Sequence, residues 1–213
     1  IAAIDGQGRE DLWYGYDRDD KATNEDDRDQ ILPYLALAEN NGIEVMVTDY
    51  CSTQTKMTDS YEQNNQQSFI SFAANDRELQ GIPGFPDKPN NENTADILQL
   101  RDAQNFLYLI NPGAYSSKEA FLMALETSTY DLILIDAFYD DTWLTAADID
   151  RISTKPQGGN RLVISYMSIG EAEDYRFYWQ ASWDATPPSW LAGENSQWKG
   201  NYKVRYWEAV WQD

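Results

Sequence analysis

Short apolar segments alternate with amphipathic segments along this chain, and that alternation restricts its fold more than any other feature. Residues 43–49, 106–110, 131–136 and 161–169 have the apolar, β-branched and aromatic content of buried strands. Strands separated by short helices indicate βαβ units and a parallel sheet. The sequence therefore predicts an α/β fold with five parallel strands at most, counting the opening segment.

Helix signals lie between these strands. Residues 116–127 and 145–153 each begin with Ser or Thr followed three residues later by an acidic residue, which is a helix-capping pattern. Residues 23–41 are predicted to form a third helix with an acidic first turn and an Asn-Gly end, and Pro33 is expected to kink it.

The remaining segments are less regular. Residues 1–5 and 11–16 are predicted to be short strand-like pieces on either side of Gly6-Gln7-Gly8. Residues 51–95 are rich in Gln, Asn, Pro and Gly, and we expect a long loop insertion packed on a surface. The tail, residues 171–213, holds six of the eight tryptophans, which are expected to pack together.

Charge and composition exclude several classes of function. The net charge of −20 disfavours nucleic acid, whose phosphates need basic partners, and favours a cationic polymer; solubility in a salty habitat is the alternative. No apolar run is long enough to span a bilayer, and no signal peptide is visible in the chain.

Histidine is absent and Cys51 is the single cysteine. These counts exclude histidine-based triads, His/Cys zinc sites and intrachain disulfides, so no metal or cofactor is expected. Calcium bound by carboxylates stays open, although no EF-hand spacing occurs. We expect Cys51 to be a small buried hydrophobe.

The run from Val163 to Trp179 carries the clearest chemical signal. An apolar strand ends at Gly170, and two carboxylates, an arginine and several aromatic rings follow directly. Acidic groups and flat rings at the C-terminal end of a strand lie where α/β folds assemble active sites. Such a combination is suited to binding and cleaving a sugar.

From Lys155 to Gln212 the sequence resembles glycoside hydrolase family 114, the endo-α-1,4-polygalactosaminidase-like barrels. The matching residues are Gly158-Gly159-Asn160-Arg161, the Tyr166–Trp179 run, Pro188-Ser189-Trp190-Leu191, Glu194-Asn195, Trp198-Lys199-Gly200-Asn201-Tyr202 and Arg205-Tyr206-Trp207. Residues 105–111 and 130–139 resemble the two preceding strands of that family. The resemblance implies a (β/α)8 TIM barrel in one domain spanning residues 1–213.

The resemblance also implies an unusual strand order. Residues 5–14 resemble a late barrel strand and residues 45–50 the last one, so the barrel would be circularly permuted or would join two tandem domains. The middle segment of the family, which bears one proposed catalytic carboxylate, would fall beyond Asp213. The barrel is then incomplete, with about five of eight strands, and whether this chain alone is active stays open.

Glycoside hydrolysis uses two carboxyl groups, one as acid and one as base or nucleophile. The resemblance maps Glu10 onto a proposed catalytic glutamate, and Glu171 and Asp136 follow the ends of predicted strands. Glu10 could instead be a solvated turn residue, Glu171 a helix N-terminal acid and Asp136 a loop cap. The candidate substrate-binding residues are Asp49, Tyr50, Tyr14, Tyr166, Glu173, Tyr175 and Arg176. Arg176 could equally form a structural ion pair with Glu173, and the tyrosines could fill the core.

The leading hypothesis is a secreted or cell-envelope glycosidase that cleaves an α-linked, galactosamine-type polysaccharide, with a monomer favoured. One alternative is a non-catalytic carbohydrate-binding or cell-surface domain. The other is an acidic module whose charge serves solubility alone.

Overall fold

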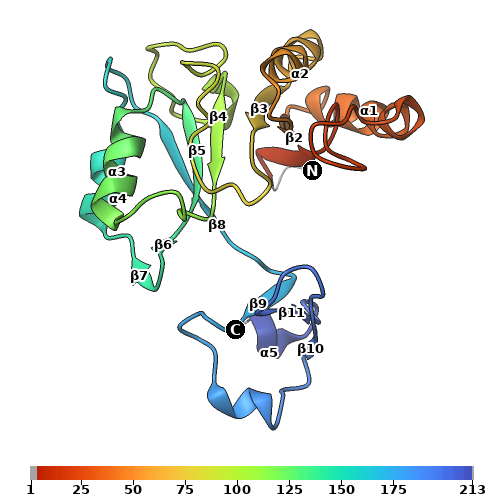
Figure 1. Cartoon of the computed structure of the whole chain (residues 1–213), viewed down its shortest axis with the longest axis vertical. Coiled ribbons are helices and arrows are strands. Elements are labelled where there is room, and N and C mark those ends of the chain that lie inside the picture. Colours follow the sequence, from red (N-terminus) through yellow and green to blue (C-terminus); the bar gives the residue numbers. More distant parts are fainter. Residues whose placement is uncertain (1–3, 213) are drawn as a thin grey trace. The chain divides into compact units, whose positions relative to one another are not determined.

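The chain folds into two compact units, and the computed structural model describes residues 4–212 of it (Figure 1). The first unit comprises the residues up to Ala137 together with Leu144–Ser165, and the second comprises Phe138–Trp143 and the residues from Tyr166 onward. Each unit has its own sheets and its own buried apolar cluster. None of the described helices is long and apolar enough to cross a membrane.

The first unit is a set of parallel βα elements. In chain order they are β1 (Gly6–Glu10), α1 (Glu25–Glu39), β2 (Glu44–Tyr50), α2 (Gln54–Gln66), β3 (Ile70–Ala74), a 3-10 turn (Leu100–Asp102), β4 (Phe106–Leu109), α3 (Lys118–Thr127), β5 (Leu132–Asp136), α4 (Ala146–Ile152) and β8 (Leu162–Tyr166). Strands β1–β2–β3 form one three-stranded sheet and β4–β5–β8 another. The pairings of β1 with β2, of β2 with β3 and of β4 with β5 are parallel.

The second unit is mainly antiparallel. It contains the hairpin β6 (Phe138–Tyr139) and β7 (Thr142–Trp143), then β9 (Glu171–Glu173), a 3-10 turn (Ala181–Asp184), β10 (Leu191–Glu194), β11 (Asn201–Val204) and α5 (Ala209–Gln212). Strand β11 lies in the middle of the sheet and pairs antiparallel with both β10 and β9.

The expected (β/α)8 barrel, whether incomplete or permuted, is wrong for this chain. Its parallel strands form two separate three-stranded sheets, and the other two sheets within residues 4–212 are antiparallel. The physical reason lies after β8, where the chain turns back on itself and Ala172 pairs with Tyr202 in an antiparallel ladder. This tail adds no further parallel strand to the sheets of the first unit.

Several local predictions are also corrected. Residues 1–3 lie outside the described residues, and the first strand, β1, covers residues that were placed between the two predicted strand-like pieces. Residues 11–16 form turns with a single bridge at Tyr14 instead of a strand. Helix α1 runs through Pro33. The α3 cap is Ser117, whose hydroxyl accepts from the Ala120 amide, so this helix begins later than expected.

The predicted long loop at residues 51–95 is wrong in its first half, because it contains α2 and β3. Helix α2 buries Met57, Ser60, Tyr61 and Asn64, which have the spacing of one helix face. Two of these four are polar residues that are satisfied by hydrogen bonds inside the protein. The composition of the segment therefore resembled a loop although its periodicity is helical.

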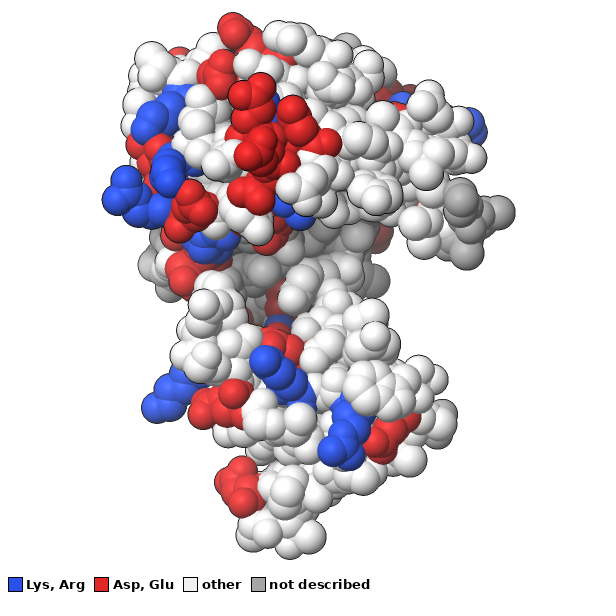
Figure 2. Space-filling view, turned by 90° about the vertical axis from the view of Figure 1, so that its right-hand side faces the viewer, with Lys and Arg blue, Asp and Glu red and all other residues white. Residues whose placement is uncertain are grey.

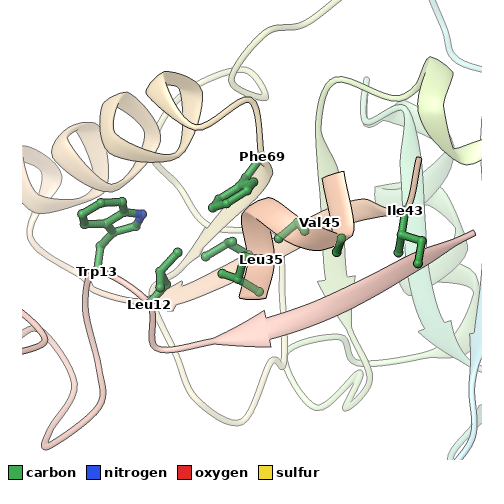
Figure 3. Close-up of a cluster of buried hydrophobic side chains, with 8 residues drawn as sticks. Leu12, Trp13, Leu35, Ile43, Val45 and Phe69 are labelled. Carbon is green, nitrogen blue, oxygen red and sulfur yellow. The ribbon is translucent and has the colours of Figure 1, made fainter. Parts of the chain in front are cut away.

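The buried cluster of the first unit joins α1 to β2. Figure 3 shows Leu12, Trp13 and Phe69 directed at the same volume as Leu35 of α1 and Val45 of β2. The Trp13 indole Nε1 also donates to Asn64 Oδ1 at 2.9 Å, which ties the segment after β1 to α2. The end of β1, where Glu10 lies, is thereby held against two helices.

The aromatic tail forms the core of the second unit. Ala172, Trp190 and Val204 are buried, with Trp179, Trp183 and Trp211 packed against them. The expected packing of the tail tryptophans is confirmed for these four, whereas Trp198 and Trp207 are exposed.

Buried tyrosines make the folded state sensitive to alkali. Burial raises the pKa of Tyr61 to about 12, although the Ala73 amide that donates to its oxygen acts in the opposite direction. A group whose pKa is higher in the folded than in the unfolded state keeps its proton when the unfolded chain loses it. The contribution of Tyr61 to the stability of the folded state is complete below pH 10, the ordinary tyrosine pKa. This contribution is lost as the pH rises toward 12.

We therefore expect the free energy of unfolding to fall between pH 10 and pH 12, with Tyr61 contributing up to about 2–3 kcal/mol of the loss. Urea unfolding measured at intervals across this range tests the expectation. In the Tyr61→Phe variant the decline should be shallower by that amount. An identical decline in both proteins would contradict the assignment.

Candidate functional site

Glu10 and Tyr50 meet at the carboxyl-terminal edge of the β1–β2–β3 sheet. Glu10 is the last residue of β1 and pairs with Thr48, so Tyr50, two residues further along β2, lies on the same face of the sheet. The Tyr50 hydroxyl donates to Glu10 Oε1 at 2.9 Å. Glu10 is exposed and Tyr50 is buried, so a solvent-accessible carboxylate is held in place by a phenol from the neighbouring strand.

The environment keeps Tyr50 in its protonated form. Burial raises the pKa of the Tyr50 phenol, and the nearby charge of Glu10 raises it further. The phenol therefore remains a hydrogen-bond donor to Glu10 over the whole physiological pH range. The guanidinium of Arg77 covers the Tyr50 ring, with its central carbon 3.9 Å from the ring centroid.

Arg77 is itself fixed by two carboxylates. Its guanidinium contacts both oxygens of Asp11, at 2.8 and 3.3 Å, and its Nε contacts Asp19 at 2.7 Å. Asp11 follows Glu10 directly and has a φ of 61°, a left-handed conformation that aspartate adopts more readily than most residues. Neither Arg77 nor Asp11 was predicted as a site residue, and Arg77 lies in the segment that was predicted to be a loop.

Asp49 has a structural position. It is 0% exposed, and its Oδ1 accepts from the backbone amides of Trp13, at 2.8 Å, and Tyr14, at 3.2 Å. Its Oδ2 accepts from Ser60 Oγ, at 2.7 Å, and Asn64 Nδ2, at 3.2 Å. Burial raises the pKa of Asp49, and the donated hydrogen bonds oppose that shift. The carboxylate thus joins the segment after β1 to α2 and is buried away from solvent, which argues against the substrate-binding role predicted for it.

Tyr14 and Asp136 complete the predicted residues of the first unit. The Tyr14 hydroxyl donates to Asp59 Oδ2 at 2.7 Å, and partial burial, with this hydrogen bond, raises the pKa of Tyr14. Asp136 is the buried last residue of β5, at the carboxyl-terminal end of the other parallel sheet. Glu10 and Asp136 therefore both terminate parallel strands of the first unit. The strand end was predicted for Asp136, whereas Glu10 was expected between two strand-like pieces.

The other predicted residues lie in the second unit. The Glu171 carboxylate accepts from the side-chain amides of Asn195, at 2.7 Å, and Asn201, at 3.3 Å. The Tyr175 hydroxyl donates to the same Asn201 side chain at 3.3 Å. The structure therefore brings Glu171 and Tyr175 together through one asparagine, at the end of the sheet where β9 and β11 pair.

Glu173 and Arg176 form an ion pair in the second unit. Glu173 is buried, and the backbone amide of the same residue donates to the Tyr178 hydroxyl at 2.9 Å. The structural interpretation of Arg176 is thus supported, because the Arg176 charge is matched by a carboxylate within its own turn. Tyr166, the last residue of β8, is half-buried.

Acidic side chains gather into a patch on the face drawn in Figure 2, in keeping with the net charge of −20. Among the residues that the structure describes, no group of three or more His, Cys, Asp or Glu side chains is arranged to hold a metal ion.

Comparison with known proteins gives relatives but no family. No family model matches the chain. An uncharacterized protein of Methanocaldococcus jannaschii is 37% identical over 123 residues, which are 58% of this chain and 34% of that protein. An uncharacterized protein of Deinococcus radiodurans is 41% identical over 93 residues, 43% of this chain and 28% of its own length. An uncharacterized protein of Thermotoga maritima is 33% identical over 99 residues, 46% of this chain and 30% of its own length.

The chain therefore spans about a third of the length of these curated relatives. Their descriptions name no activity, ligand or partner, so the resemblance to glycoside hydrolase family 114 stays a prediction.

Proposed function

We propose that the chain is part of a glycoside hydrolase that acts on an α-linked, galactosamine-type polysaccharide. The observation that carries the proposal is the pair formed by Glu10 and Tyr50, an exposed carboxylate oriented by a permanently protonated phenol at the end of two parallel strands. Arg77 and Asp11 hold this pair in place. Positioned carboxyl groups supply the acid, base or nucleophile of glycoside hydrolysis.

Within this proposal Glu10 is the base or nucleophile, because its oriented oxygen accepts a hydrogen bond and its side chain reaches solvent. Asp136, which ends β5 in the other parallel sheet of the first unit, is the candidate for the second carboxyl group. The net charge of −20 favours a substrate with protonated amines, such as a partly deacetylated galactosamine polymer. A secreted or cell-envelope location would bring the protein to such a polymer.

Release of reducing ends from partly deacetylated polygalactosamine by the full-length protein tests the proposal. We expect Glu10→Gln to lower the rate at least about 100-fold, because the amide can neither accept a proton nor attack a sugar carbon. Glu62→Gln is the matched control, since Glu62 is an exposed glutamate on α2 away from the strand ends, and its rate should equal that of the unaltered protein.

Two outcomes would remove the proposal. One is the absence of reducing-end release from every galactosamine-containing polymer, and the other is an unchanged rate in Glu10→Gln. Retention of the polymer on an affinity gel without turnover would favour the second candidate, a non-catalytic carbohydrate-binding domain. The exposed aromatic side chains of the second unit, among them Tyr175, Phe177 and Trp207, favour that candidate.

A further inference from the structure

Three aromatic rings of the second unit form a cluster that was not predicted from the sequence. Phe138 and Trp143 face each other across the β6–β7 hairpin, with ring centroids 4.0 Å apart. The Phe177 ring lies 5.9 Å from Phe138 and 5.3 Å from Trp143, between centroids. These three residues are called the aromatic pad below.

The aromatic pad is open to solvent. Trp143 is 52% exposed and Phe177 is 71% exposed. Large apolar side chains rarely gather at a surface without a binding role. Because Phe138 and Trp143 come from a hairpin and Phe177 from the segment after β9, two parts of the chain are needed to build the cluster.

The turn of the same hairpin carries two carboxylates. Asp140 and Asp141 form the turn that joins β6 to β7, directly between Phe138 and Trp143, and both are exposed. Asp140 has a φ of 46°, in the left-handed region that a tight hairpin turn requires. An exposed aromatic surface with two adjacent negative charges attracts organic cations more strongly than neutral or anionic ligands.

One cationic side chain of the protein already lies over a ring of the aromatic pad. The Arg176 guanidinium carbon is 4.9 Å from the Phe138 ring centroid, while the Arg176 charge is paired with Glu173. The pairing offsets the positive charge of Arg176, so this side chain need not repel a second cation on the exposed rings.

We propose that the aromatic pad is a binding subsite for a protonated amino sugar of a polysaccharide chain. The inference rests on the proposed function for the identity of the polymer, but it concerns binding and not bond cleavage. The exposed faces of Trp143 and Phe177 contact the apolar face of the sugar, and the amine lies over a ring beside Asp140 and Asp141.

Binding measured by calorimetry tests the subsite. The ligand is a galactosamine oligosaccharide with free amines, and every protein is the full-length chain in a Glu10→Gln background, which prevents turnover during the titration. We expect Trp143→Ala and Phe177→Ala each to raise the Kd about five- to tenfold, because a ring that holds the cation and the sugar face is lost. Trp143→Phe should restore most of the affinity.

Two controls separate the subsite from general effects. Tyr34→Ala removes an aromatic ring that is 71% exposed on α1 in the first unit, and its Kd should be unchanged. The fully N-acetylated oligosaccharide, which has no cationic amine, should bind at least about tenfold more weakly than the free amine.

The outcomes distinguish this inference from the proposed function. An unchanged Kd in both Trp143→Ala and Phe177→Ala overturns the subsite, even if the unaltered protein cleaves the polymer. Equal binding of amine and N-acetylated ligands overturns its selectivity for cations. A raised Kd in both variants supports the subsite, even if the unaltered protein releases no reducing ends.

Discussion

Asp49→Ala is expected to lower the free energy of unfolding by about 3–5 kcal/mol. Asp49 is 0% exposed and accepts four hydrogen bonds, two from backbone amides and two from side chains of α2. Alanine would leave these buried donors without an acceptor, and each such group costs roughly 1–3 kcal/mol. The cavity left by the carboxylate adds to the loss.

Chemical denaturation of the variant and the unaltered protein measures the difference. Asp49→Asn should cost less than Asp49→Ala, because its amide oxygen can still serve the Trp13 and Tyr14 amides. The NH2 group that this substitution introduces, however, would face Asn64 Nδ2, which is also a donor. Asp87→Ala is the matched control at an exposed aspartate and should change stability by less than about 0.5 kcal/mol.

The same experiment separates structure from substrate binding. If Asp49 contacted the substrate, Asp49→Ala would weaken binding while leaving the unfolding free energy nearly intact. We expect the reverse, with any loss of activity following the loss of folded protein. A stability change below about 1 kcal/mol would contradict the structural role.

The elements that the sequence predicted well are those in which propensity and burial agree. Strand β2 is apolar along most of its length, and the α4 cap makes both hydrogen bonds of a capping box: the Thr145 hydroxyl accepts from the Asp148 amide, and the Thr145 amide donates to the Asp148 carboxylate. Asp136 was placed correctly at the end of a strand, because a carboxylate after an apolar run is a local pattern. Glu10 follows a polar, glycine-rich run, so its position at the end of β1 had no such signal.

The errors arose in elements whose structure depends on contacts between residues that are far apart in the sequence. Helix α2 was hidden because Ser60 and Asn64 look like loop residues, and only their hydrogen bonds to Asp49 make burial favourable. The burial of Asp49 and its four hydrogen bonds were not foreseen for the same reason. The barrel was expected from the resemblance to glycoside hydrolase family 114. The alternation of strands and helices predicted only a parallel sheet, and it does not say whether the next strand pairs parallel or antiparallel.

Arg77 and the aromatic pad could not have been found by spacing alone. Arg77 is 66 residues from Asp11 in the sequence, and Phe138 and Phe177 come from separate segments. The run Phe-Tyr-Asp-Asp-Thr-Trp at residues 138–143 did carry a local signal for a tight, exposed hairpin.

The buried ion pair between Lys155 and Asp131 leads to the second large prediction. Both side chains are 0% exposed, and Lys155 Nζ lies 2.7 Å from Asp131 Oδ1 and 3.0 Å from the carbonyl oxygen of Asn93. Asp131 precedes β5 and also accepts from the Gln104 amide at 2.9 Å and from the Asn105 side chain at 3.4 Å. The pair therefore links the amino-terminal ends of β4 and β5 to the segment before β8.

Lys155→Met is expected to lower the free energy of unfolding by about 3–5 kcal/mol, because it leaves a buried carboxylate without its cation. Methionine has a length similar to that of lysine. The loss of stability therefore reflects the missing positive charge more than a change in side-chain volume. Lys21→Met is the control at an exposed ion pair with Asp17, and it should cost no more than about 1 kcal/mol. Urea unfolding of both variants at neutral pH provides the comparison.

The double variant Lys155→Met with Asp131→Asn makes the test specific to the ion pair. If an uncompensated charge causes the loss in Lys155→Met, removing the second charge should restore part of the stability, so the two effects will not add. Recovery will be incomplete, because asparagine can keep one acceptor oxygen for the Gln104 amide but replaces the other Asp131 oxygen with an NH2 group that has no acceptor opposite it in the place of Lys155. Strictly additive losses would mean that the two side chains stabilise the fold independently, and the ion pair would then not be the link between these strands.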